Sequence, residues 1–136
     1  MTIETALHWI AGEWLPSQDG ALAESIDPAT GQALGRFAAG GRAEARAAIA
    51  AAKRAFLDPA WSQNPRLRQD VLLAWAARLD ARKDELARLL TRENGKAIAQ
   101  SRGEMGGAIS EIRYYAGLAR HVPGHVLEVE PGVFST

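Results

Sequence analysis

The Gly-Lys pair at residues 95–96, with three more glycines by residue 107, is the part of this chain whose residue types best suit phosphate binding. A phosphate-binding loop needs a glycine, four intervening residues, Gly-Lys and then Ser or Thr. Leu90 stands at the first of these positions and Ala97 at the last. The later glycines do not follow the pattern G-x-G-x-x-G, and no strand-like run precedes them. The spacing argues against nucleotide binding here, and we assign no cofactor-binding residue.

Nucleophiles and acid–base groups are equally hard to assemble from this sequence. It contains no cysteine, and no serine lies in a G-x-S-x-G setting. Tyr114 and Tyr115 are adjacent in a helical segment, where we expect one ring in the core and one at the surface. Asp84 and Arg88 are one helical turn apart, which predicts an ion pair on a solvated helix face. We therefore assign no catalytic residue to this chain.

Glu93 is the carboxylate that stands out. It is expected in the last helical turn before Gly95, where backbone carbonyl oxygens already concentrate negative charge. The interpretation that the spacing favours is that Arg92 or Lys96 neutralises the negative charge of Glu93. A cation bound among oxygen ligands is the alternative, and it stays open on the residues alone.

Composition sets the broad class of the protein. The chain has 136 residues, 47% of them hydrophobic, and a formal net charge of +0. These values exclude a disordered chain and argue against a nucleic-acid-binding surface. His121 and His125 lie close together, but without cysteine or acidic ligands at zinc spacing. Because the sequence has no secretion signal and no membrane-spanning apolar run, we expect a cytoplasmic protein without a membrane partner.

Residues 1–41 are expected to form short β-hairpins. Residues 8–15, HWIAGEWL, carry aromatic and apolar side chains on both sides of an Ala-Gly pair, which is typical of a hairpin. In residues 27–31, DPATG, the proline fixes φ and the glycine accepts a positive φ. That pentapeptide predicts a tight turn between two short strands.

Residues 42–121 are expected to be mainly helical. Residues 42–56 are rich in alanine, the best helix former, and Asp58-Pro59 should end that helix. Asn64 suits the N-cap of the next helix, because Pro65 follows it at the first helical position. The apolar residues expected to share one face are Ala45, Ile49, Ala52 and Phe56 in the first helix, then Val71, Leu72, Trp75, Leu79, Leu86, Leu89 and Leu90.

Gly95 suits the residue that ends this second helical region, although periodicity leaves open a break near Asp80. A further helix with a narrow packing seam should follow. Gly103 and Gly107 share one face of it, and with Gly106 they cost about 2–3 kcal/mol of helix propensity. Close approach of another backbone or a kink can explain them. The seam residues are Ile98, Met105, Ile109, Ile112, Ala116 and Ala119.

The last residues return to a strand pattern. Residues 126–130 form a short strand bounded by Pro131-Gly132. A lone strand near the end of a chain must find a partner, and we expect either the hairpins near residue 10 or another chain.

Four motifs occur in order along this chain: HWIAGEW at residues 8–14, IDPATG at 26–31, ENGKA at 93–97 and RYYAG at 113–117. The series resembles the N-terminal portion of the NAD(P)-dependent aldehyde dehydrogenase family, from His8 to the end of the chain. Ala97 departs from the family's usual proline. The resemblance implies that this mainly α segment with short β-hairpins is part of an α/β three-layer fold.

The resemblance also implies a function. Such enzymes oxidise a small-molecule aldehyde to a carboxylic acid with NAD or NADP, through a Cys thiohemiacetal. The family's catalytic Cys, Asn and Glu lie downstream of the segment represented here, so this chain alone is predicted to be inactive. Residues 42–121 correspond to the helical part of the dinucleotide-binding domain, and residues 122–136 to the start of an oligomerisation strand. The implied partners are the remainder of the enzyme and further copies in a homo-oligomer.

A structural Na⁺ or K⁺ site is a further implication of the resemblance. In the family, two backbone oxygens before the D/N-P-x-T/N-G turn and the acid of the D/E-x-G-K motif hold this ion. Those positions match Ser25, Ile26 and Glu93 here.

The alternative from another class is a stand-alone helical module that supports interaction or oligomerisation without catalysis. In either case the segment should expose apolar faces, including those that bear Phe56, Trp61 and Trp75.

Overall fold

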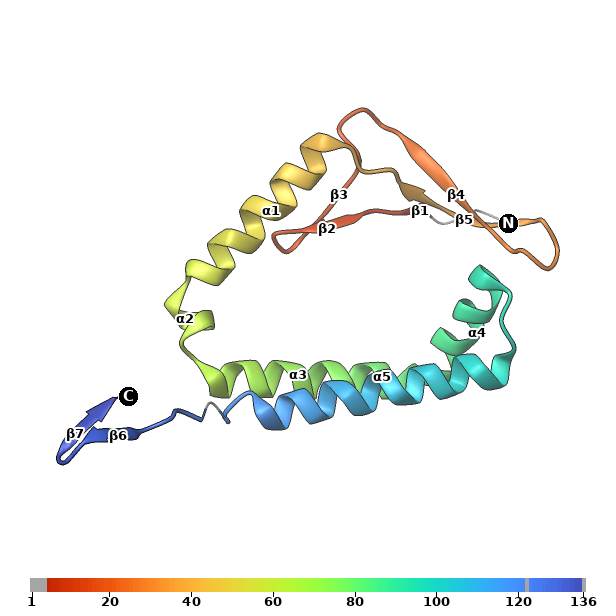
Figure 1. Cartoon of the computed structure of the whole chain (residues 1–136). Helices are drawn as coiled ribbons and strands as arrows, with labels where there is room; N and C mark the ends of the chain where they lie inside the picture. The colour runs from red at the N-terminus through yellow and green to blue at the C-terminus, as the bar shows by residue number, and fades with distance from the viewer. Residues whose placement is uncertain (1–4, 122, 136) are drawn as a thin grey trace.

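The computed structural model describes residues 5–121 and 123–135 (Figure 1). Short strands come first, helices make up the middle of the chain, and a pair of strands follows. The fold of this segment is therefore mainly α with small sheets, as the sequence predicts. The elements are β1 (Thr5–Ala6), β2 (His8–Ile10), β3 (Glu13–Leu15), β4 (Leu22–Ile26), β5 (Ala33–Ala38), α1 (Arg42–Leu57), α2 (Pro59–Ser62), α3 (Pro65–Ala81), α4 (Lys83–Asn94), α5 (Ile98–Leu118), β6 (Leu127–Glu130) and β7 (Val133–Ser135).

The N-terminal strands form two small sheets. β2 and β3 pair antiparallel, with Trp9 opposite Trp14 and their ring centres 4.8 Å apart. β4 and β5 form a second antiparallel hairpin, and β1 pairs in parallel with the other edge of β5. The turn between β4 and β5 closes through a 2.7 Å hydrogen bond from the Gly31 N–H to the Asp27 carbonyl oxygen. The predicted hairpin and turn are both confirmed.

A chain of hydrogen bonds joins these strands to one another and to α1. The hydroxyl of the buried Ser17 donates to the Ala39 carbonyl oxygen over 2.8 Å and lies 3.0 Å from His8 Nε2. Because the Ser17 proton is directed to Ala39, His8 Nε2 is the donor in the other bond. The Glu44 carboxylate, in the first turn of α1, accepts the Gln18 N–H over 2.8 Å.

Alanine propensity accounts for the helical state of α1, because none of its residues is buried. Small alanines of α1 face the β2–β3 hairpin across a groove. The larger Ile49 and Phe56 are 68% and 72% exposed. The large side chains of the predicted apolar face of α1 are therefore uncovered by the residues that the structure describes.

Side-chain caps set the boundaries of the next helices. Asp58 ends α1 as predicted, but its carboxylate also caps the short helix α2, which the sequence analysis missed. The Asn64 side chain accepts the Leu67 N–H over 3.0 Å, which confirms Asn64 as the N-cap of α3. Arg82 separates α3 from α4, so the break left open near Asp80 does occur.

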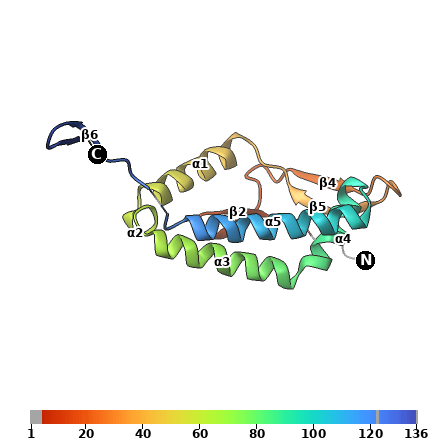
Figure 2. The ribbon, with the colours of Figure 1, turned by 60° about the horizontal axis from the view of Figure 1, so that its bottom comes forward.

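Helices α3, α4 and α5 pack against one another and hold most of the buried residues. α5 lies alongside α3 and also contacts α4 (Figures 1 and 2). The predicted seam of α5 is confirmed at Ile109 and Ala116. Ser101 is buried as well, and its hydroxyl is satisfied by the Thr91 hydroxyl at 2.8 Å. The buried residues of these helices are Ala76, Ala87, Ser101, Ile109 and Ala116.

Two interior glycines of α5, Gly103 and Gly107, do not pack against any described part of the chain. α5 is one continuous helix without a sharp bend (Figure 1). A Cβ added at Gly103 or Gly107 would meet no atom within 4 Å, whereas one at Gly106 would lie 3.1 Å from Lys83 Nζ. The prediction that another backbone packs closely on Gly103 and Gly107 is thus wrong for the described residues. Packing of further polypeptide on these glycines stays a prediction.

The C-terminal strand finds its partner in the residues that follow it. β6 pairs antiparallel with β7, with Leu127 opposite Ser135. The expected pairing with the first hairpins or with another chain is therefore wrong for this edge of β6, because the Pro131-Gly132 turn returns the chain locally. Both strands are exposed along their whole length, and the hairpin projects away from the helices (Figures 1 and 2).

Large apolar and aromatic side chains are exposed over much of the surface. Phe56, Trp61 and Trp75 are among them, as the sequence analysis expects. Tyr114 and Tyr115 are both exposed and stack edge to face, 5.4 Å apart. The prediction of one core ring is wrong, because the side of α5 that meets α3 and α4 carries Ile109 and smaller residues.

Within residues 5–121 and 123–135, none of the helices combines the length and the apolar character needed to span a lipid bilayer.

Candidate functional site

The turn at residues 26–31 and the C-terminal end of α4 meet in space. Gly95 ends α4 in the left-handed conformation with φ 77°, as predicted, and a Cβ there would lie 3.0 Å from Pro28 Cγ. Arg92 Nε lies 4.0 Å from the Asp27 carboxylate. Two motifs that are far apart in the sequence therefore form one structural feature.

A surface cavity of about 660 Å³ lies beside this junction. Ser25 from β4 and Glu93 from the last turn of α4 both line it, whereas Ile26 does not. The β4–β5 register shifts between Ser25 and Ile26, and such a bulge takes backbone groups out of the regular ladder. The other lining residues are Thr5, Ala6, Leu7, Trp14, Leu34, Gly35, Arg36, Phe37 and Leu89.

Glu93 takes part in none of the ion pairs formed by the described residues. Its two basic neighbours in the sequence point elsewhere: Arg92 faces Asp27, and Lys96 Nζ lies 2.6 Å from Glu104. The interpretation that Arg92 or Lys96 compensates Glu93 is therefore wrong. The carboxylate of Glu93 remains available to another positive charge.

Arg36 of β5 contributes to the lining of the same cavity. Its Nε lies 3.1 Å from the carboxylate of Glu24, the residue directly opposite it on β4. Cross-strand neighbours of opposite charge attract one another. The sequence analysis missed the Arg36–Glu24 pair, because finding it requires the register of β4 against β5. The position of the turn at residues 27–31 was the only signal in the sequence for that register.

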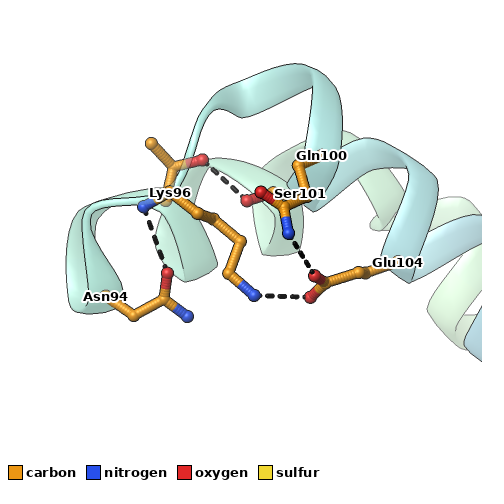
Figure 3. Close-up of polar contacts among 6 residues, drawn as sticks. Asn94, Lys96, Gln100, Ser101 and Glu104 are labelled. Atoms are coloured by element: carbon orange, nitrogen blue, oxygen red, sulfur yellow. Dashed lines mark hydrogen bonds and ion pairs between the residues drawn. The ribbon is translucent and has the colours of Figure 1, made fainter.

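The corner between α4 and α5 fixes the side chain of Lys96 (Figure 3). The Lys96 backbone N–H donates to Asn94 Oδ1 over 3.2 Å. Its ammonium donates to Glu104 Oε2, and Gln100 Nε2 donates to the other oxygen of that carboxylate over 3.3 Å. With its side chain only 21% exposed, Lys96 is held in one place.

One acidic residue of α3 and one of α4 form ion pairs with α5. Asp84 contacts Arg102 at 3.0 Å, and Asp80 contacts Arg113 at 2.8 Å. The predicted Asp84–Arg88 pair is wrong, because α5 lies along this side and supplies a guanidinium. These pairs are exposed, so each contributes little to stability, and neither resembles a pair of catalytic carboxylates.

The donor groups near Glu93 suit a hard cation better than a transition metal. Among the residues that the structure describes, no group of three His, Asp or Glu side chains could hold a metal ion. His121 and His125 are both exposed. The cavity instead presents the Glu93 carboxylate, and carboxylate oxygens are ligands of hard cations.

Comparison with known proteins assigns the chain to a family. Residues 14–136 match the model of the aldehyde dehydrogenase family, and the chain belongs to that family. It is 37% identical over 123 residues to a glutarate-semialdehyde dehydrogenase of Pseudomonas putida, covering 86% of this chain and 25% of that protein. It is 38% identical over 122 residues to the NADP(+) succinate-semialdehyde dehydrogenase of Escherichia coli, and that match covers 85% of this chain and 25% of the relative.

The fold matches solved structures of the same family. The crystal structure of an NAD-dependent aldehyde dehydrogenase from Sinorhizobium meliloti superposes with a TM-score of 0.89 and 27% sequence identity. That match covers 97% of this chain and 27% of the other. The chain thus spans about a quarter of the length of the relatives that it matches.

Proposed function

We propose that this chain is the N-terminal portion of an enzyme that oxidises an aldehyde to a carboxylic acid with NAD or NADP. The observation that carries this proposal is the family match over residues 14–136, which aligns with only a quarter of each relative. The residues described here serve as scaffold, and the substrate aldehyde binds elsewhere in the enzyme.

The proposed chemistry needs a thiolate to attack the aldehyde carbonyl, an amide donor for the resulting oxyanion and a carboxylate to activate water. The nicotinamide cofactor, when bound, accepts the hydride. The sequence has no cysteine, so the thiolate has to come from polypeptide outside these 136 residues. We accordingly place no step of the reaction on a residue of this chain.

The surface area of the chain supports a scaffold that other polypeptide covers. The chain exposes 10319 Å², whereas a compact monomer of 14.6 kDa exposes roughly 6,900 Å². The excess includes the apolar side of α1 and the β6–β7 hairpin. We propose that residues 42–121 support the dinucleotide-binding domain and that residues 122–136 contribute to subunit contacts in a cytoplasmic homo-oligomer.

An assay of aldehyde-dependent NAD(P)H formation tests whether catalysis requires the remainder of the enzyme. The full-length enzyme should reduce NAD or NADP with a panel of semialdehydes, and the 136-residue chain should not. Measurable turnover by the purified chain would contradict the scaffold assignment. A full-length protein without activity on any aldehyde would contradict the assignment of the reaction.

We also propose that the cavity beside α4 holds a structural Na⁺ or K⁺ ion in the complete enzyme. The Glu93 carboxylate and the backbone oxygens of Ser25 and Ile26 are its ligands from this chain. Support comes from the shared cavity of Ser25 and Glu93, the register shift at Ile26 and the absence of a basic partner for Glu93 among the described residues.

The melting temperature of the full-length enzyme, measured against KCl or NaCl at constant ionic strength, tests this site. A ligand that binds only the folded state raises the melting temperature with its concentration. Glu93→Gln should remove most of that rise. Glu85→Gln, on the same helix but far from the cavity, is the control and should retain it. An equal response in Glu93→Gln would reject the site.

A further inference from the structure

We propose that the groove between α1 and the β2–β3 hairpin holds an amphipathic helix from the remainder of the same enzyme subunit. This inference rests on the scaffold role proposed above, and it names the kind of element that covers α1. The groove has two walls. The hairpin supplies Trp9 and Ile10, and α1 supplies alanines from the side that faces the hairpin (Figure 1).

Two adjoining hollows of about 270 and 340 Å³ make up this groove. Both are lined by Trp9, Ile10 and Ala48, so they form one continuous depression along α1. The lining is apolar except at the end next to the start of α1, where His8 and Glu44 lie. The Trp9 side chain is 59% exposed, whereas tryptophan is highly buried on average. An apolar depression with an exposed tryptophan in its wall is typical of a surface that another polypeptide covers.

The spacing of the alanines in the groove favours a helix as the occupant. The alanines that line the groove in steps of three, four and three residues are Ala45, Ala48, Ala52 and Ala55. These steps are typical of the seam between two packed helices. Because small side chains on a seam shorten the distance between helix axes, a second helix can lay larger apolar side chains into the groove. Ile49 and Phe56, both exposed, are one helical turn from Ala52, so the same helix covers them.

The surface area of the chain favours the enzyme's own polypeptide over a second copy as the source of this helix. The chain exposes roughly 3,400 Å² more than a compact monomer of its mass. A standard interface covers only about 800 Å² on each partner. A dimer contact alone therefore leaves most of the excess open. The chain spans 25% of a relative's length, so polypeptide outside this quarter of the enzyme can cover the excess.

Filling the groove tests whether another element occupies it in the full-length enzyme. Ala48→Leu and Ala52→Leu place a larger side chain where the helix packs, and each should lower the melting temperature by roughly 2–6 °C. Ala50→Leu is the matched control, because Ala50 lies one turn from Arg46 and Arg54 on the polar side of α1. It should shift the melting temperature by less than about 2 °C. Losses in the groove variants no greater than in the control would overturn the proposal.

Photo-cross-linking of the full-length enzyme identifies the occupant, and it also keeps the proposal testable if the leucine variants fail to fold. A photo-reactive benzoylphenylalanine that replaces Ile49 attaches to its nearest neighbour on irradiation, and peptide mass spectrometry locates the attachment. We expect a cross-link within one subunit, to an amphipathic helical segment outside residues 1–136. A cross-link between subunits would assign the groove to a second copy and overturn the proposal, as would any other attachment or none.

Formation of NAD(P)H by the unmodified enzyme is measured alongside these experiments. An enzyme without activity on any aldehyde would contradict the proposed reaction, whereas the melting temperatures and the cross-link report on the groove alone. The two proposals can therefore fail separately.

Discussion

Helices α1 and α5 are both long, yet they are helical for different reasons. α1 has 16 residues, many of them alanine, and none is buried. α5 has 21 residues, several of them glycine, and buries Ser101, Ile109 and Ala116 against its neighbours. Local propensity therefore accounts for α1, whereas tertiary packing accounts for α5.

The two helices also differ in how far the described residues cover their apolar side chains. α5 already has its partners, α3 and α4, within this segment. α1 presents Ile49 and Phe56 to solvent, and the scaffold proposal assigns the cover of these side chains to the remainder of the enzyme. Such cover would add tertiary packing to a helix that local propensity alone maintains in this segment.

The largest expected effect comes from truncating one isoleucine in each helix. In the isolated chain, Ile109→Ala should lower the free energy of unfolding by about 2–4 kcal/mol, because Ile109 is 2% exposed and its loss leaves a cavity. Ile49→Ala is the matched change at an exposed position and should change the free energy of unfolding by no more than about 0.5 kcal/mol. Urea unfolding followed by circular dichroism measures both values.

The same pair of variants in the full-length enzyme sharpens the comparison. There, Ile49→Ala should cost more than in the isolated chain, since other polypeptide then covers the outer face of α1. If Ile49→Ala lowers the free energy of unfolding equally in the two proteins, the proposal that other polypeptide covers the outer face of α1 loses its support. Equal costs for Ile49→Ala and Ile109→Ala in the isolated chain would break the contrast between the helices.

The glycines of α5 give an effect of intermediate size whose sign depends on context. Gly103→Ala and Gly107→Ala should each stabilise the isolated chain by about 0.5–1 kcal/mol, because alanine favours the helix and the added Cβ meets nothing. In the full-length enzyme the same changes should lower the melting temperature if another backbone packs there. Stabilisation in both proteins would show that these glycines have no packing role.

The smallest expected effect is a pH dependence confined to α1. Backbone N–H groups of Gln18, Glu44 and Gly41 hold the pKa of the Glu44 carboxyl below its ordinary value of 4.5. A depressed pKa in the folded state means that this stabilisation is complete above about pH 4.5 and is lost as the pH falls through the folded-state value.

Chemical shifts of α1 amides, followed by NMR from about pH 7 to about pH 3, measure this dependence. In Glu44→Gln the acid-induced change at the start of α1 should disappear. Glu111→Gln, an exposed change on α5, should leave it in place. An unaltered profile in Glu44→Gln would assign the transition to other carboxylates.

Features encoded by neighbouring residues could be predicted from the sequence. Asn64 caps α3 through its own side chain, and Gly95 ends α4 because glycine accepts the left-handed conformation. The turn at residues 27–31 depends on the same local chemistry. The seam of α5 also follows from its periodicity, at Ile109 and Ala116.

Features that depend on the arrangement of helices and strands in space could not be predicted. Asp84 selects Arg102 over Arg88 because α5 lies alongside, and no spacing within α4 encodes that choice. The pairing of Arg36 with Glu24 required the register of β4 and β5. At the candidate site, the resemblance pointed to Ser25, Ile26 and Glu93, and the fold places Ser25 and Glu93 on one cavity. The acidic partners of Arg92 and Lys96 emerged only from the structure.

The close contact of Gly95 with Pro28 makes these two positions interdependent. Asparagine is the usual replacement for glycine at a left-handed helix end. Here its Cβ would lie 3.0 Å from the pyrrolidine ring, so backbone tolerance alone does not admit it. A substitution at position 95 therefore requires either a shift of the turn at residues 27–31 by a few tenths of an ångström or a smaller residue at position 28.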